Sequence, residues 1–173
     1  RHSNNEQVDK ALRRYLSEPG KNWTTDTQLR LDGPDKPFYR HGRANQKKLI
    51  FEWINQALSN GEVTYDPNLT IEHVMPQHLT PAWRREFGTL PKSEVEGLHA
   101  LLLHTIGNLT LTLDNSGLSD HSFANKRSRI AKKGTGLVIT QQITRQKTWT
   151  PAKIRARSRT LIAAIIKEWP GPE

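Results

Sequence analysis

The stretch Thr70-Ile71-Glu72-His73-Val74-Met75-Pro76-Gln77 has the pattern of a short strand with an abrupt end. Apolar and polar residues alternate along it, and Pro76 cannot donate to a strand ladder, so pairing stops there. Glu72 and His73 are neighbours at this end, and neighbouring side chains of a strand point to opposite faces. The stretch therefore predicts a strand that ends in a carboxylate and an imidazole.

A second stretch, Leu109 to Leu113, predicts a partner strand. Its Leu and Thr residues alternate after Asn108, as expected of a strand with one buried face. Asp114-Asn115 then signals a turn, and Ser119 is a residue type that caps helices. The predicted order is strand, long loop, strand and helix, with polar residues at the joints.

This order and spacing resemble the HNH, or ββα-metal, nucleases. The narrower resemblance is to the C-terminal HNH domain of GmrSD-type modification-dependent restriction proteins, a group that includes the phosphorothioate-sensing SspE-like anti-phage proteins. It implies a mainly helical α+β fold with a small ββα-metal finger, and it covers most of the chain from about Tyr39 onward. The residues that carry it are Ile71-Glu72-His73-Val74-Met75-Pro76-Gln77, Trp83, Ile106-Gly107-Asn108-Leu109-Thr110-Leu111, Asn115, Leu118, Phe123 and Lys126, with a looser match at Trp149, Ile154, Arg157, Leu161 and Trp169.

The chain of 173 residues is long enough to bury a core, and we expect one folded unit in three parts. Residues 1–69 form a helical N-terminal part, residues 70–133 the finger with a helical insertion, and residues 134–173 a basic C-terminal segment with a helix. Because the first residue is Arg1 and not Met, we expect a fragment of a longer protein.

Three segments carry more specific predictions of structure. The apolar stripe of residues 5–18 predicts a helix that packs against the core. Residues 119–133 are predicted to form one helix, the helix of the finger, with its cap at residue 119. Residues 136–144 have a β-like but ambiguous pattern.

The composition excludes several classes of protein. There is no cysteine, so disulfides and cysteine-based zinc sites are excluded. The chain has neither a signal-peptide pattern nor an apolar run approaching the roughly 20 residues of a membrane span. We therefore expect a bacterial cytoplasmic protein without a membrane partner.

The formal net charge of +9 is unevenly distributed. Residues 126–173 hold twelve Lys or Arg against two Glu, whereas residues 1–125 hold fourteen against fifteen Asp or Glu. A basic surface beside a phosphoesterase site suggests DNA, bound through its backbone without sequence readout; a solvated face is the alternative. The candidate nucleic-acid contacts are Lys126, Arg127, Arg129, Lys132, Lys133, Lys153, Arg155 and Arg157.

A smaller basic cluster, residues 39–43, lies outside that segment. It offers cations that could touch phosphate, but a lead-in to the following helix is the favoured interpretation.

His73 is the candidate general base. Hydrolysis of a phosphodiester needs an activated water, and the ordinary imidazole pKa of about 6.5 lies close to working pH. A lone histidine is otherwise often a buried, hydrogen-bonded core residue. The adjacent Glu72, the terminating Pro76 and the two Asn residues favour the catalytic interpretation.

Glu72 and Asn115 are the candidate metal ligands. Glu72 offers a carboxylate on the face opposite His73, and Asn115 offers a neutral carbonyl oxygen at the start of the next helix. Two oxygen ligands completed by water form the sparse shell that Mg²⁺ prefers, and Mn²⁺ would substitute. Asn125 competes for the second position, so both Asn residues remain candidates.

The family resemblance implies further roles. It places Asn108 where the family's middle Asn braces the loop and orients His73, and it puts Glu72 where the family more often has Asp. It implies metal-dependent DNA nicking that leaves a 5′-phosphate and a 3′-hydroxyl, in defence against phage. It also implies a partner, an N-terminal ParB-like, nucleotide-hydrolysing domain of the same protein that senses DNA modification.

Other interpretations stay open. The chain could be a catalytically silent DNA-binding domain, an RNase or broad-specificity nuclease, or a module that docks on the N-terminal domain. Structural roles are favoured for His99 and His104, although His104 is close enough to Asn108 to approach the site. Core packing is favoured over base stacking for Trp83.

Overall fold

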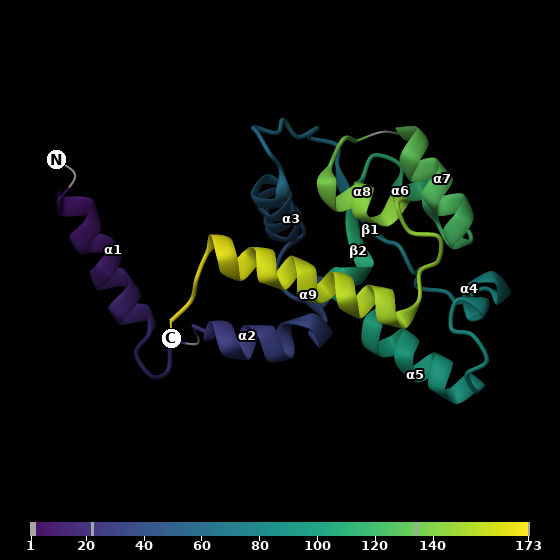
Figure 1. Ribbon diagram of the computed structural model, residues 1–173, viewed down its shortest axis with the longest axis horizontal. Coiled ribbons are helices and arrows are strands. Elements are labelled where there is room, and N and C mark those ends of the chain that lie inside the picture. The colour runs from purple at the N-terminus through teal and green to yellow at the C-terminus, as the bar shows by residue number, and fades with distance from the viewer. Residues whose placement is uncertain (1–2, 22, 134, 173) are drawn as a thin grey trace.

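The structure is a computed structural model that describes residues 3–21, 23–133 and 135–172, and it is mainly helical (Figure 1). The expectation of a mainly helical α+β fold is confirmed. In chain order the elements are α1 (Ser3–Leu16), α2 (Asp26–Asp32), η1 (Gly33–Asp35), η2 (Phe38–Arg40), α3 (Ala44–Leu58), β1 (Thr70–His73), α4 (Pro81–Arg85), α5 (Lys92–Leu102), η3 (Ile106–Asn108), β2 (Leu109–Thr112), α6 (Asn115–Leu118), α7 (Phe123–Lys133), α8 (Val138–Thr144) and α9 (Pro151–Glu168), where η marks a 3₁₀ helix.

The two predicted strands form an antiparallel pair. His73 of β1 lies opposite Leu109 of β2, and Val74 N–H donates to Asn108 C=O at 2.9 Å just beyond the strand. The pairing ends before Pro76, as expected of a residue without an N–H. Strand, strand and helix follow in the predicted order, whereas a metal-binding function for this unit stays a prediction.

Helix α9 crosses the middle of the molecule, with α3 and the strands on one side and α2 and α5 on the other (Figure 1). It begins at the cap Thr150, whose Oγ1 accepts a hydrogen bond from Lys153 N–H, and at Pro151 in the first turn. Helix α9 packs tightly against η3. A methyl group on Gly107 would collide with the Ile154 carbonyl and with Ser158 of α9. The glycine therefore permits the backbone of η3 to pack directly on α9.

The predicted core position of Trp83 is confirmed. Its side chain is fully buried, and its indole Nε1–H donates to the His121 carbonyl at 2.8 Å. In the described part of the chain, no helix is long and apolar enough to cross a membrane.

The predicted packing role of the first helix is wrong. Helix α1 projects from the rest of the molecule (Figure 1), and Val8, Leu12 and Tyr15 are 63%, 53% and 51% exposed. Its last turn is tied down, because Arg13 donates to the carbonyls of Pro170 and Gly171 at 3.1 and 3.2 Å. An apolar stripe predicts a helix, but it does not guarantee that another element covers it.

Two boundaries after β2 also differ from prediction. The helix expected over residues 119–133 begins only at Phe123, as α7. Ser119, the predicted cap, instead follows the separate short helix α6 and has a positive φ of 36°. The β-like segment is helix α8, in which Ile139 and Ile143 are both buried. Residues four apart share a helix face, so tertiary packing decides this ambiguous pattern in favour of helix.

Candidate active site

The end of β1, η2 and the region around α6 enclose a cavity of about 310 Å³, here called the catalytic cavity. Three predicted site residues meet in it: Glu72 and His73 from the end of β1, and Asn115 from the start of α6. Among the described residues that line it, Asn115 is present and Asn125 is not. The complete lining is Tyr39, Ile71, Glu72, His73, Pro76, Gln77, His78, Asn115, Ser119 and Asp120.

His73 is a buried, uncharged imidazole. Burial, with the nearby charges of His104 and Lys126, lowers the pKa of His73 to about 4. Its Nε2 lies 3.1 Å from His104 Nδ1, so one of these nitrogens donates to the other. If His73 Nε2–H is the donor, the lone pair of the neutral ring is on Nδ1, which is then the basic atom.

His104 is a site residue that the sequence did not identify. Tyr39 packs on both rings: its centroid is 4.4 Å from that of His73 and 5.7 Å from that of His104, to which it is stacked. Tyr39 N–H also donates to the His104 carbonyl at 3.0 Å. A structural role was favoured for it, and the one signal in the sequence was its position close to Asn108, just before the second motif.

Lys126 was wrongly predicted to bind nucleic acid. Its side chain is fully buried, and its Nζ donates to Glu72 Oε1 at 2.5 Å and to the His73 carbonyl at 2.8 Å. Burial raises the pKa of Glu72 and lowers that of Lys126, and in each case the charge of the partner opposes the shift. The ammonium group thus fixes the carboxylate and the end of β1 together, and it is not available to a phosphate.

Asn108 does not line the catalytic cavity but is fully buried behind it. Its Oδ1 accepts from Met75 N–H at 2.8 Å and from Trp149 Nε1–H at 3.1 Å. Its Nδ2 donates to the carbonyls of Met75 and Leu103, both at 2.9 Å. The amide therefore braces the loop that follows His73, and its contribution to catalysis stays a prediction.

The lining of the catalytic cavity suits a hard divalent cation with few protein ligands. Asn115 Nδ2 donates to the Ile71 carbonyl at 3.1 Å, which makes Oδ1 the ligand atom. Glu72 supplies a carboxylate, and Asp120 lines the same cavity. The described residues contain no group of three or more His, Cys, Asp or Glu placed to hold a metal, but Mg²⁺ commonly binds through one or two carboxylates with water.

Arg157 was also wrongly predicted as a nucleic-acid contact. Its buried guanidinium donates to the carbonyls of Gly107 and Leu109 at 2.8 and 2.7 Å, and to that of Ile139 at 3.0 Å. Burial lowers the pKa of Arg157 to about 9. This side chain joins α9 to η3, β2 and α8. Its charge therefore fixes the backbone of these elements and is not available to DNA.

The other six predicted contacts lie nearer the surface, and most already have partners in the protein. Lys132 and Lys133 are exposed. The remaining pairs are Arg127 with the Gln146 carbonyl at 3.0 Å, Arg129 with Asp114 at 3.9 Å, Lys153 with Thr148 Oγ1 at 2.9 Å and Arg155 with Asp35 at 3.5 Å.

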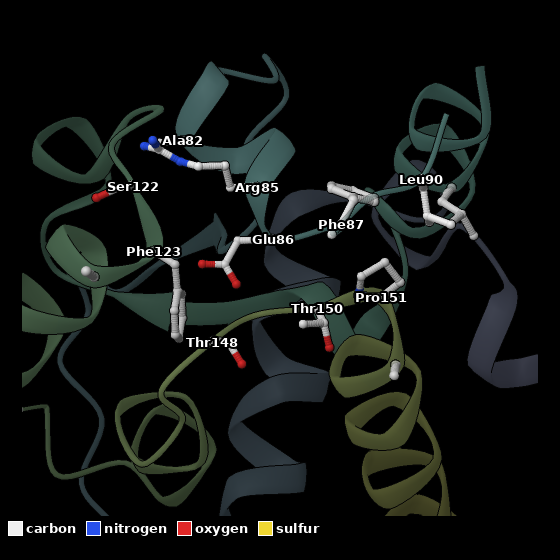
Figure 2. Close-up of a pocket in the computed structure, with 14 residues that line it drawn as sticks. Ala82, Arg85, Glu86, Phe87, Leu90, Ser122, Phe123, Thr148, Thr150 and Pro151 are labelled. Carbon is white, nitrogen blue, oxygen red and sulfur yellow. The ribbon is translucent and has the colours of Figure 1, made fainter. Parts of the chain in front are cut away.

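A larger cavity, of about 760 Å³, lies between α4, α5 and the first turns of α7 and α9 (Figure 2). Phe87, Phe123 and Pro151 make much of its wall apolar, and the Glu86 carboxylate there accepts from Trp149 N–H at 2.7 Å. None of the predicted site residues lines it. Size therefore does not identify the functional site in this molecule.

Comparison with known proteins agrees with this arrangement. No curated protein and no solved structure was found to match the chain. The family described as "GmrSD restriction endonucleases, C-terminal domain" matches residues 23–164, which include both strands and every residue of the catalytic cavity. The chain therefore belongs to the family of C-terminal domains of GmrSD restriction endonucleases.

Proposed function

We propose that this chain is a metal-dependent HNH endonuclease domain that nicks DNA. The observation that carries the proposal is the meeting of an uncharged, buried imidazole, a carboxylate and an amide oxygen in one cavity at the end of β1. Membership in a family of restriction endonucleases supports DNA as the substrate.

His73 acts as the general base in this proposal. Its pKa of about 4 leaves the ring neutral at physiological pH, and a neutral ring has a lone pair for the proton of an attacking water. Hydrogen bonding to His104 and edge contact with Tyr39 hold the ring in one orientation. Asn108 contributes indirectly, by fixing the loop that begins directly after His73.

Glu72 and Asn115 would hold Mg²⁺, with Mn²⁺ as a substitute. When bound, the metal supplies positive charge for the phosphate and the leaving oxygen. Lys126 holds the Glu72 carboxylate in place through the Oε1 atom, which limits its rotation. One catalytic cavity serves one strand, so we expect a monomer to nick, with hydrolysis leaving a 5′-phosphate and a 3′-hydroxyl.

We also propose that the domain is the effector of a phage-defence protein. An N-terminal ParB-like, nucleotide-hydrolysing domain would then sense DNA modification and select the target. Exposed basic residues such as Lys132 and Lys133 would hold the DNA backbone, giving an affinity that falls steeply with salt.

Relaxation of supercoiled plasmid tests the proposal. With Mg²⁺ or Mn²⁺ we expect open circles that EDTA and the His73→Ala variant both abolish. Equal cutting by His73→Ala would overturn the assignment of the base. Salt-sensitive binding without any cutting would favour a silent DNA-binding domain, and faster cleavage of structured RNA at equal phosphate concentration would favour an RNase.

A further inference from the structure

We infer that the exposed basic residues Arg40 and Arg43, with Lys47 and Lys48, bind phosphates of the DNA strand that flank the scissile phosphate. We call these four residues the η2–α3 basic cluster. The inference rests on the proposed nuclease function and specifies the path of the cleaved strand. It assigns the main phosphate contacts to residues in η2 and around the start of α3 rather than to the C-terminal segment.

The first support is a second cavity that adjoins the catalytic one. It measures about 320 Å³, and the two cavities share Tyr39, Ile71 and Asn115 in their linings. Lys47 and Lys48 line the second cavity. The hollow that begins at His73 therefore continues toward the start of α3, as a groove for an extended strand would.

The second support is charge. Residues 36–51 contain no Asp or Glu, and they include all four cations of the cluster. Arg40 and Arg43 are exposed. Burial is the main cause that lowers the pKa of His104, and the nearby charge of Arg40 adds to it. The opposite rim of the catalytic cavity carries Asp120, so the polyanion is favoured on the η2–α3 side.

The third support is the attachment of the cluster to the site. Tyr39 N–H donates to the His104 carbonyl at 3.0 Å, and Lys47 Nζ donates to the Tyr39 carbonyl at 2.7 Å and lies 4.6 Å from its ring centroid. Lys48 Nζ donates to the Pro67 carbonyl at 2.7 Å. Lys47 Nζ also donates to the Gly42 carbonyl at 3.2 Å, and Lys48 Nζ lies 3.8 Å from Glu52 Oε1. An ammonium group has three donors, so Lys47 keeps one for a phosphate, whereas a phosphate at Lys48 would compete with Glu52.

Salt dependence of binding tests the cluster apart from catalysis. Binding of a short DNA duplex would be measured in EDTA, where no cutting is expected, for the wild-type chain, for Arg40→Gln/Arg43→Gln, and for Arg30→Gln/Lys92→Gln. The last variant removes the same charge from exposed positions on α2 and α5. Circular dichroism would show that each variant is folded.

We expect the cluster variant to reduce the slope of log affinity against log salt by about 0.7 to 0.9 for each lost phosphate contact, and the control to leave the slope nearly unchanged. Equal slopes for the two variants would overturn the inference. If the slope changes as expected while the wild-type chain nicks no plasmid with Mg²⁺ or Mn²⁺, the phosphate site stands and the proposed catalysis fails.

A neutral phosphate locates the contact. Methylphosphonate would replace single phosphates near a nick site, and each would be combined with Arg40→Gln in a double-mutant cycle. At a phosphate directly beside the scissile one, we expect the substitution to have no further effect once the phosphate is neutral. Additive effects at every position tested would contradict the inferred path.

Discussion

At the scale of single residues, His73 couples the site to the stability of the fold. Its pKa is about 6.5 in an unfolded chain and about 4 in the folded one, so between these values the unfolded chain binds more protons. Folding stability therefore falls as the pH decreases from 6.5 toward 4, by about 3 kcal/mol in total.

Urea unfolding of the wild-type chain and of His73→Gln across this pH range measures the effect. Glutamine does not titrate, so the difference between the two unfolding free energies should shrink as the pH falls. A difference that is independent of pH would contradict the depressed pKa.

His104 gives a second prediction at this scale. Replacing it by leucine removes the hydrogen bond to His73 and should lower kcat about tenfold, because one net hydrogen bond is of the order of 1 kcal/mol. Asparagine can place its Oδ1 near the position of the lost Nδ1 and should restore most of the rate. NMR of the His73 ring nitrogens measures the tautomer directly. An unchanged tautomer in His104→Leu would contradict the role of His104 in orienting His73.

Lys126→Met should unfold the domain more easily, because it leaves the buried Glu72 carboxylate without its partner. Breaking a buried ion pair in this way costs about 3 to 5 kcal/mol. Lys132→Met is the matched control on the exposed face of the same helix and should stay within about 0.5 kcal/mol of wild type. Denaturant unfolding measures both, and similar losses would mean that the pair contributes little.

The first motif was sufficient to predict that Glu72 and His73 lie together at one strand end, but not that both line the same cavity, nor what surrounds them. Glu72 and His73 are adjacent in sequence, so their placement follows from one strand end. The partners Lys126 and His104 depend on how α7 and the loop after α5 pack against that strand. Sequence alone treats a lysine on an amphipathic helix as exposed, and here packing has buried it.

At the scale of elements, the contact between η3 and α9 makes Gly107 sensitive to substitution. Gly107→Ala would place a methyl group against the backbone of α9, and we expect a loss of about 1 to 3 kcal/mol from overpacking. Gly97→Ala is the control: it lies within α5 with open space around it, and alanine there should stabilise by about 0.5 to 1 kcal/mol. Thermal unfolding separates the two, and equal shifts would argue against a tight contact.

Elements with a local signal were predicted well, and those decided by packing were not. The two strands follow from alternation and a terminating proline, and α9 is the helix expected within residues 134–173. The segment over residues 136–144 carries too few residues for its period to distinguish strand from helix. Its helical form depends on burying Ile139 and Ile143, which are in different apolar clusters of the core.

At the scale of the whole molecule, α1 is nearly independent of the rest. Val8, Leu12 and Tyr15 are more than half exposed and Leu16 is only partly buried, so removing residues 1–17 should change the unfolding free energy by no more than about 1 kcal/mol. Chemical denaturation of the shortened and full chains compares them. A larger loss would mean that the stripe is covered in solution.

The net charge predicted a polyanion partner, but it does not identify which Lys and Arg residues would contact that partner. Arg157 shows why, since its charge is used inside the protein, on three backbone carbonyls. The cluster at the start of α3 holds fewer cations than the C-terminal segment, yet it lies beside the catalytic cavity. The number of Lys and Arg residues in a segment does not say how close they lie to the catalytic cavity, because that distance is set by the fold.

The crossing of α9 has a consequence for synthesis on the ribosome. A nascent chain that extends only to Lys133 already contains all the candidate catalytic and metal-binding side chains. It still lacks Trp149 and Arg157, which hold Asn108 and the η3 loop from the far end of the sequence. The packing around the candidate site is therefore complete only after Trp149 and Arg157 have left the ribosome, later than any residue that lines the cavity.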